Sequence, residues 1–350
     1  MYKSTIRPLL FLLEPERAHR LTFNLLKKSN RIPFLRRFLR SKYQYEEEKL
    51  ICKGIVSKNR IGLSAGMDKG AEVFNELFDF GFGFIEVGTV TPHACAGNPV
   101  PRIFRLPRYN SLISRTGFNN PGVEVVKKRL RYRSGKVTIG VNINKDPQSE
   151  GQQVIEDFLH MYMELYTNAD YFTINWGTLE LQQMKEVLEA LTRRRESLVI
   201  KRPILLKLPG DITHEGMDTV LEVIAQYGLD GVIATGPTND RSQIRRYSEQ
   251  ELNAMGAGGV SGKGLGMKPL LAVDYLRRNG GKDLLIIGAG GVMTPGDACR
   301  MISMGADFVQ IYSAFIYEGP GIVADMIQAV ADMNEEPESP LQKFRMNSAK

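Results

Sequence analysis

The chain has 350 residues, of which 43% are apolar and 24% charged, and a formal net charge of +7. This composition supports a sizeable buried core and excludes an intrinsically disordered or collagen-like chain. Its three cysteines, Cys52, Cys95 and Cys299, are widely spaced, which argues against a disulfide framework and against a metal site. The longest early apolar run, Leu9 to Leu13, is far short of the ~20 residues of a membrane-spanning helix. We therefore expect a protein of a reducing, cytoplasmic compartment.

Positive charge is concentrated at the N-terminus. Residues 1–45 contain eleven Lys or Arg and two acidic residues, a net charge of +9, so the remaining 305 residues sum to −2. This asymmetry favours an anionic surface as partner, either membrane headgroups or nucleic acid. Because the segment has few aromatic residues for base stacking and no DNA-binding motif, we expect no nucleic-acid partner.

The basic segment is predicted to form three short amphipathic helices. Their apolar faces are formed, in chain order, by Ile6, Leu9, Leu10 and Leu13, by Leu21, Leu25 and Leu26, and by Phe34, Leu35, Phe38 and Leu39. An apolar stripe beside cationic residues is typical of a helix that lies in a membrane interface. The alternative is that these helices pack on the body of the protein and leave their basic faces in water. Residues 1–45 are thus predicted to be a helical extension that docks on a membrane.

From residue 61 the chain alternates short β-rich runs with helical patterns. The predicted strands are Ile61–Ala65, Gly83–Gly88, Val137–Asn142, Tyr171–Asn175, Ile204–Leu208, Gly231–Thr235, Leu284–Gly288 and Asp307–Gln310. Eight such βα units predict an α/β fold, a (β/α)8 TIM barrel, over residues 46–334. Residues 89–136 form a long polar excursion after the second strand, which we interpret as an active-site insertion. Residues 335–350 are predicted to be a polar tail.

Chemistry in such a barrel lies where the strands end. Asn142 and Asn175 end two predicted strands, Lys207 lies in a third, and Gly288-Ala289-Gly290-Gly291 follows a fourth. Amide side chains can bind the edge of a planar heterocycle, a lysine can stabilise charge on a reduced flavin, and a glycine-rich turn suits a phosphate. The alternatives are a salt-bridged barrel lysine, asparagines that cap loops, and a flavin-free barrel that acts on sugar phosphates. The last alternative leaves the amides unexplained.

Seven ordered motifs extend this interpretation. They are EPERAH at 14–19, GLSAGMDK at 62–69, GFGFIEVGTVTP at 81–92, PRIFRL at 101–106, TGFNN at 116–120, GVIAT at 231–235 and QIYS at 310–313. On these motifs the chain resembles, from Met1 to about Pro320, the class 2 dihydroorotate dehydrogenases, which are quinone-linked and membrane-associated. The resemblance implies an FMN-dependent oxidation of dihydroorotate to orotate in pyrimidine biosynthesis, with quinone as acceptor. It also implies a peripheral location on the cytoplasmic side of the cell membrane.

The resemblance also assigns residues to roles. It implies flavin contacts at Ala65, Gly66, Lys69, Thr89, Asn142, Asn175, Lys207, Thr235, Gly262, Gly291, Tyr312 and Ser313. Substrate contacts are implied at Lys69, Ser114, Gly117, Phe118 and Asn175, and quinone contacts at His19 and Arg105. For His19 a simple helix-surface residue is the alternative. Lys69 and Lys207 are expected to take part in catalysis, by orienting the substrate ring and by stabilising the reduced flavin.

The substrate side departs from the family pattern. In the family, a loop after the fourth strand reads Asn-x-Ser-Ser-Pro-Asn, and its second serine removes the C5 proton while C6 delivers hydride to the flavin. Here the loop reads Asn175-Trp-Gly-Thr-Leu-Glu180 and is about five residues shorter. Thr178 then stands at the base position, and Glu180 replaces an amide, where its charge would repel an anionic pyrimidine. Ser114 and Gly236 replace two further family asparagines.

Two alternatives to dihydroorotate oxidation remain open at this point. One is a divergent FMN-binding relative that uses another small substrate. The other is a catalytically inactive, flavin-binding, membrane-associated protein, whose pocket is filled by Trp176. For Trp176 itself the alternative is a packing residue beneath a shortened loop.

Overall fold

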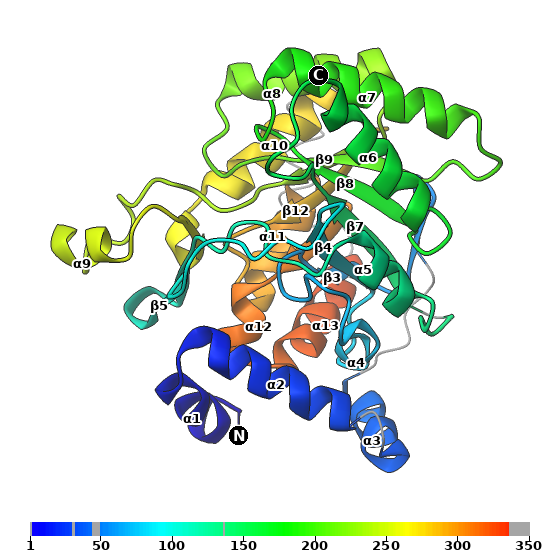
Figure 1. Cartoon of the computed structure of the whole chain (residues 1–350). Helices are drawn as coiled ribbons and strands as arrows, with labels where there is room; N and C mark the ends of the chain where they lie inside the picture. The colour runs from blue at the N-terminus through cyan, green and yellow to red at the C-terminus, as the bar shows by residue number, and fades with distance from the viewer. Residues whose placement is uncertain (1, 30–31, 44–49, 136, 336–350) are drawn as a thin grey trace.

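A closed barrel of parallel strands forms the centre of the molecule. The computed structural model describes residues 2–29, 32–43, 50–135 and 137–335. Within these residues eight parallel strands follow one another around the barrel in sequence order, and β13 closes it by pairing with β3. The predicted (β/α)8 barrel is thereby confirmed, and Figure 1 shows its helices surrounding the strands. The predicted tail lies, from residue 336, outside the described residues.

The observed elements agree with the predicted ones, although most of their ends differ by a few residues. The barrel strands are β3 Ile61–Leu63, β4 Phe84–Val90, β7 Thr138–Ile143, β8 Tyr171–Asn175, β9 Ile204–Lys207, β10 Gly231–Ala234, β12 Leu285–Ala289 and β13 Phe308–Ile311. The helices of the barrel are α4 Phe74–Phe78, α5 Val123–Leu130, α6 Gln152–Leu165, α7 Leu181–Glu196, α8 His214–Tyr227, α10 Lys268–Gly280, α11 Pro295–Ser303, α12 Ser313–Glu318 and α13 Gly321–Glu335. A further short helix, α9 Glu249–Ala254, lies in the segment between β10 and β11.

Three aspartates join neighbouring strands at the amino end of the barrel. Each directly precedes a strand, accepts a hydrogen bond from a backbone N–H of the adjacent strand, and pairs with an arginine. They are Asp170 with Ile139 and Arg133, Asp230 with Ile204 and Arg195, and Asp307 with Ile286 and Arg277. Because a buried backbone donor needs a partner, these carboxylates fix the strand register where the ladder begins.

Apolar side chains fill the interior of the barrel toward the amino ends of its strands. Phe84, Tyr171, Phe308 and their neighbours form a cluster that is almost fully buried. Beneath it lies the hairpin of β1 (Leu50–Cys52) and β2 (Ile55–Ser57), whose Ile55 belongs to the same cluster. The interior is therefore closed at the amino end, and only the carboxyl end remains for a site.

The predicted insertion after the second strand contains regular structure. Residues 89–136 hold β5 (Ile103–Leu106), β6 (Ser111–Ser114) and α5, the helix of that barrel unit. Strand β6 pairs with both β5 and the distant β11 (Gly259–Gly262) in an antiparallel sheet. The sequence analysis predicted an insertion here but not its strands, because four-residue strands carry little local signal, and a partner about 150 residues away gives none.

Three helices of the N-terminal segment pack against one end of the barrel. A π-helical turn (Tyr2–Ile6) leads into α1 (Arg7–Leu12), and α2 (Pro15–Ser29) and α3 (Pro33–Tyr43) follow. In α2, Ala18 and Phe23 are buried, and Phe23 joins the main core. Arg36 and Arg40 of α3 both pair with the buried carboxylate of Asp79. The segment therefore packs on the body through part of its surface.

The carboxylate of Asp170 offers a direct test of the joints between strands. Asp170→Ala leaves the N–H of Ile139 without its partner and removes the carboxylate from Arg133, which keeps only the carbonyl oxygen of Asn168 among the contacts described for its guanidinium. Because each unsatisfied buried donor costs about 1–3 kcal/mol, we expect the free energy of unfolding to fall by roughly that amount or more. Urea denaturation measures the change, and Asp283→Ala, at an exposed position, is the matched control. Equal midpoints for the two variants would contradict this role.

Candidate active site

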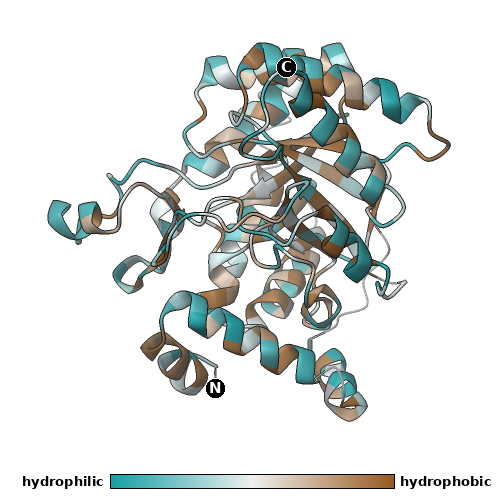
Figure 2. Ribbon diagram, in the orientation of Figure 1, coloured by the Kyte–Doolittle hydropathy of each residue, from teal (hydrophilic) through white to brown (hydrophobic). Residues whose placement is uncertain are grey.

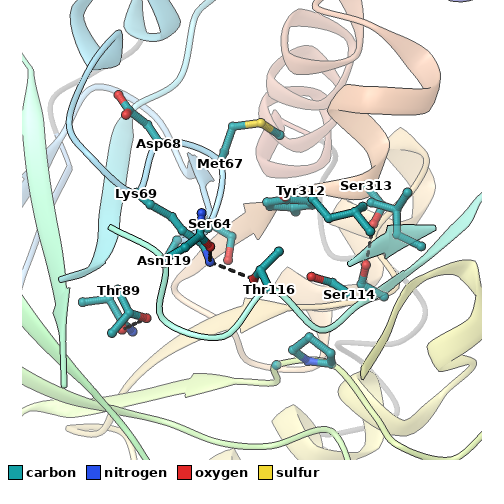
Figure 3. Close-up of a pocket in the computed structure, with 18 of the residues that line it drawn as sticks. Ser64, Met67, Asp68, Lys69, Thr89, Ser114, Thr116, Asn119, Tyr312 and Ser313 are labelled. Atoms are coloured by element: carbon teal, nitrogen blue, oxygen red, sulfur yellow. Dashed lines mark hydrogen bonds between the residues drawn. The ribbon is translucent and has the colours of Figure 1, made fainter. Parts of the chain in front are cut away.

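A cavity of about 770 Å³ opens at the carboxyl end of the barrel. Its wall combines the loops after β3 and β13, the ends of the intervening strands, the β5–β6–β11 sheet and one face of α2. Figure 3 shows side chains from several of these segments directed into the same space. The volume lies within the ~300–1,000 Å³ that is typical of small-molecule and cofactor sites.

A buried carboxylate organises the floor of this cavity. Glu86, in the middle of β4, has no solvent exposure. Its Oε2 accepts hydrogen bonds from Gln310 Nε2 at 2.8 Å and Tyr171 OH at 3.3 Å, and its Oε1 lies 3.5 Å from Lys207 Nζ. Asn142 also donates to Oε1, at 3.5 Å. A buried charge needs such compensation, so the polar side chains around Glu86 are held in fixed positions.

Lys207 rises from the end of β9 into the cavity. Its ammonium donates to Ser64 Oγ at 3.0 Å and pairs with Glu86, and its side chain is only 11% exposed. Beside it, Asn142 and Asn175 exchange hydrogen bonds of 3.0 Å in both directions, and Thr89 donates to Asn142 at 2.6 Å. A fixed cation and a layer of amides therefore face the ligand space from three neighbouring strands.

Lys69 faces the same space from the loop after β3. Its Nζ donates to Asn119 Oδ1 at 2.7 Å, Thr116 Oγ1 at 2.8 Å and the Gly117 carbonyl oxygen at 3.0 Å. All three partners are neutral. Burial, together with the nearby guanidinium of Arg102, lowers the pKa of Lys69 to about 8. This lysine can therefore exchange a proton near neutral pH.

Bare backbone lines the opposite part of the cavity, where β11 and the loops after β12 and β13 meet. Gly290 and Gly291 have φ of +91° and +72°, and Gly262 has φ of +84°. A Cβ on Gly262 would lie 2.5 Å from the Asn110 carbonyl oxygen and 3.1 Å from Cβ of Ser313. Only glycine fits there, because the positive φ disfavours a side chain and no space remains for a Cβ between Asn110 and Ser313. Such a cradle suits an anionic group.

Helix α2 covers one side of the cavity with His19 and Phe23, whose rings lie 4.0 Å apart between centroids. Glu16 of the same helix accepts two hydrogen bonds from Arg102, at 3.1 and 3.0 Å, which joins the helix to the insertion. Burial lowers the pKa of His19 to about 4, although Glu72 and Glu16 act in the opposite direction. The imidazole is therefore neutral at physiological pH.

Most of the predicted site residues line this one cavity. They include all twelve predicted flavin contacts, namely Ala65, Gly66, Lys69, Thr89, Asn142, Asn175, Lys207, Thr235, Gly262, Gly291, Tyr312 and Ser313. The substrate candidates Ser114, Gly117 and Phe118 and the quinone candidate His19 also line it. Segments that lie far apart in the sequence thus contribute to a single site.

Two predicted residues lie elsewhere. Arg105 points away from the cavity toward α1, where it donates to the carbonyl oxygens of Leu13 and Phe11 at 2.6 and 3.4 Å. Thr178 is exposed, does not line the cavity, and donates to the carbonyl oxygen of Asn175 at 2.9 Å.

The shortened loop after β8 also resolves two other expectations. Glu180 is exposed at the start of α7 and outside the cavity, so the expected repulsion of an anionic substrate does not arise there. Trp176 is packed against the main core and does not line the cavity. Of the two alternatives given for Trp176, the packing residue beneath a shortened loop therefore holds, and Trp176 does not fill the pocket.

Several residues of the site escaped the sequence analysis. Glu86 and Gln310 form the floor, and Thr116 and Asn119 hold Lys69. A carboxylate in the middle of an otherwise apolar strand was the available signal for Glu86. The described residues contain no group of three or more His, Cys, Asp or Glu side chains placed to hold a metal ion.

The fold and the cavity together define a (β/α)8-barrel protein with a cofactor-sized site at its carboxyl end. A family model described as dihydroorotate dehydrogenase matches residues 49–333. The dihydroorotate dehydrogenase (quinone) of Christiangramia forsetii is 38% identical over 343 residues, which cover 95% of this chain and 99% of that protein. The protein of the same name from Coxiella burnetii is 38% identical and covers 92% and 95%, respectively.

The solved structures agree with the sequence relatives. A crystal structure of DHODH from Eimeria tenella, in complex with ferulenol, matches with a TM-score of 0.79 and 27% identity, over 96% of this chain and 97% of that one. The chain belongs to the dihydroorotate dehydrogenase family. Membership in this family implies a flavin cofactor.

The lowered pKa of His19 predicts how stability changes with pH. Between pH 6.5 and about 4 the unfolded chain binds a proton at His19 that the folded protein does not bind, so stability falls as the pH falls through this window. This one group contributes up to about 3 kcal/mol. Urea denaturation at pH 7 and pH 5 should therefore show a smaller loss for His19→Gln than for wild type. A wild-type loss no larger than that of the variant would contradict the assignment.

Proposed function

We propose that this chain is an FMN-dependent dehydrogenase that oxidises dihydroorotate to orotate and passes the electrons to a quinone. The observation that carries this proposal is the cavity in which Lys207, Lys69 and the asparagines at the ends of β7 and β8 face one space beneath His19. The names of the relatives, dihydroorotate dehydrogenase (quinone), support the choice of substrate and acceptor.

The residues present fit FMN. The amides of Asn142 and Asn175 and the hydroxyl of Thr235 can bind the polar edge of a flavin ring, and the cradle at Gly262, Gly291 and Ser313 can hold its phosphate. Gln310 lines this cavity, and its buried Oε1 has no hydrogen-bond partner among the described residues. A buried acceptor of this kind favours a ligand that supplies the missing donor.

The chain's own groups prepare the reaction in defined ways. Bound FMN would take a hydride from the substrate and release electrons to the quinone. Lys207, held by Ser64 and Glu86, places a positive charge where the reduced ring becomes negative, and it needs no reorganisation to do so. Lys69 lies between the loop after β3 and the loop after β6, where it can orient the substrate.

The side of the cavity under α2 suits a quinone. His19 is neutral there, and Phe23 beside it belongs to the apolar core. A neutral donor in apolar surroundings fits a carbonyl on a hydrophobic ring. Arg105 would act indirectly in this proposal, because it holds the carbonyl groups at the end of α1.

An anaerobic titration of the purified protein tests this function. We expect dihydroorotate to bleach the visible flavin band and a short-chain quinone to restore it. Dithionite provides the control, because it reduces any accessible flavin. A flavin that stays oxidised with dihydroorotate and bleaches with dithionite would contradict the assigned substrate.

We also propose that the protein attaches peripherally to an anionic membrane surface through its N-terminal helices, on the cytoplasmic side. These helices keep an apolar surface in water after packing on the barrel: Leu12 and Phe34 are 83% and 80% exposed, and Leu9, Leu25 and Phe38 are more than half exposed. Figure 2 shows apolar residues along α1 and α3. Exposed apolar side chains among basic residues favour a lipid interface.

No helix in the described part of the chain has the length and the apolar character needed to cross a bilayer. Cationic side chains of the segment, including Arg17 and Arg37, are exposed. Arg17 pairs with a highly exposed carboxylate, that of Glu14. Attraction to acidic headgroups therefore adds to apolar insertion in this proposal.

Vesicle binding tests the membrane proposal. The double variant Leu12→Glu/Phe34→Glu places charge on the exposed apolar surface, and we expect its affinity for vesicles with acidic lipids to fall by at least tenfold. We expect this loss because burial of each such side chain in an apolar medium contributes about 1.5–3 kcal/mol to the free energy of binding. Val199→Glu is the matched control, since Val199 is fully exposed on the loop after α7. Equal losses in both variants would contradict docking through α1 and α3.

A further inference from the structure

The oxidation of dihydroorotate needs a group that takes the C5 proton. Thr178, the residue expected at that position from the resemblance, lies outside the cavity, and its hydroxyl is engaged with the carbonyl oxygen of Asn175 at 2.9 Å. The loop that carries it has only five residues between β8 and α7. The proton acceptor must therefore be sought among the groups that line the cavity.

Thr116 is a hydroxyl that lines the cavity and contacts a titratable amine. Its Oγ1 lies 2.8 Å from Lys69 Nζ, and Figure 3 shows Lys69, Thr116 and Asn119 directed toward one another. The residue comes from the loop after β6, whereas Thr178 lies in the loop after β8. Two serine hydroxyls on the wall have different partners. Ser64 contacts the amine of Lys207, but that amine is paired with the buried carboxylate of Glu86, and Ser261 is bound to Ser313.

We propose that Thr116 takes the proton from C5 of the substrate and that Lys69 receives the proton that Thr116 gives up. The proposal rests on the function proposed above. A hydroxyl beside a neutral amine is a recurring way to make a weak base effective.

The partners of Lys69 fit both of its protonation states. The carbonyl oxygens of Gly117 and Asn119 can only accept, whereas the hydroxyl of Thr116 can accept or donate. An ammonium donates to all three partners. A neutral amine donates to the two carbonyl oxygens and accepts from Thr116, whose hydroxyl then turns from the Gly117 carbonyl oxygen, 3.2 Å away, to Lys69. Lys69 thus keeps all three of its hydrogen-bond contacts when it releases its proton.

The step balances without any further reactant. The C5–H bond breaks as its proton moves to Thr116 Oγ1, and the O–H bond of Thr116 breaks as its proton moves to the neutral amine of Lys69. The hydride on C6 leaves to the flavin, and the C5–C6 double bond of orotate forms. Lys69 ends as an ammonium and returns its proton to solvent before the next turnover.

The charges around Lys69 determine how the rate of flavin reduction depends on pH. Burial and Arg102 lower the pKa of Lys69 to about 8, and Glu16 and Cys95 act in the opposite direction. His19, from α2, also interacts with Lys69, and because the pKa of His19 is lowered to about 4 its imidazole is neutral near neutral pH. Because Lys69 must begin as the neutral amine, flavin reduction is expected to accelerate as the pH rises and to level off above about pH 8.

Rapid-mixing measurement of flavin reduction by dihydroorotate, without quinone, isolates this step. Loss of a general base typically costs 10²–10⁴-fold, so we expect Thr116→Val to be at least ~10²-fold slower than wild type. Thr116→Ser keeps the hydroxyl and should restore most of the rate together with the pH profile. Thr178→Val should be at least ~10-fold faster than Thr116→Val. Thr219→Val, on α8, is the control for a threonine outside the site.

A second measurement needs no turnover. The rate at which acetic anhydride labels Lys69, followed by mass spectrometry, should be half-maximal near pH 8, and labelling only above pH 10 would overturn the proposal. The proposal would also be overturned if the flavin of Thr116→Val were reduced at the wild-type rate. The same holds if the flavin of Thr178→Val were reduced as slowly as that of Thr116→Val. Visible absorbance and urea midpoints verify that each variant binds flavin and folds. Wild-type protein that dihydroorotate does not reduce would refute the proposed function instead, and the two failures are distinguishable.

Discussion

The carboxylate of Glu86 is the constraint on which the site depends. It is buried inside the barrel, where an isolated charge is unfavourable by several kcal/mol, and it gains compensation from Lys207, Gln310, Tyr171 and Asn142. These partners come from β9, β13, β8 and β7, so one charge aligns the polar ends of four strands. Lys207 is thereby held at the cavity floor with little freedom, which is what a preorganised electrostatic site requires.

The site also depends on closure of the barrel. The cavity combines residues from α2 to the start of α12, and its wall is complete only when β13 pairs with β3 and the β5–β6–β11 sheet assembles beside the strand ends. Arg102 links the insertion to Glu16 of α2 at 3.0 Å, so the cover over the cavity is joined to its wall. The N-terminal helices thus serve two surfaces, because one face completes the cavity and another carries exposed apolar side chains.

The architecture could be predicted well from the sequence because the strands of a parallel barrel are buried on both faces. Such strands form short apolar runs, which are separated at regular intervals by loops and helical patterns. The sequence also predicted which strand-end residues line the cavity, since their place follows from topology alone. The pairing of β6 with β11, the position of Glu86 and the direction of Arg105 depend on contacts between distant segments, which no local pattern encodes. Thr178 differs for another reason: alignment to a motif fixes a residue's order in the chain, whereas a loop of five residues determines where its hydroxyl points.

The start of the described chain contacts α12, which lies more than 300 residues further along the sequence. Tyr2 donates to the carbonyl oxygen of Ile316 at 2.7 Å and Arg7 to that of Tyr317 at 3.0 Å, across separations of 314 and 310 residues. Ribosomes add about 5–20 residues per second, so the first helix waits roughly 15–60 s before its partner α12 exists. During synthesis the apolar face of this amphipathic segment has no protein surface to cover it. Under the membrane attachment proposed above, a lipid surface would be an apolar partner within reach of this segment before the barrel has closed.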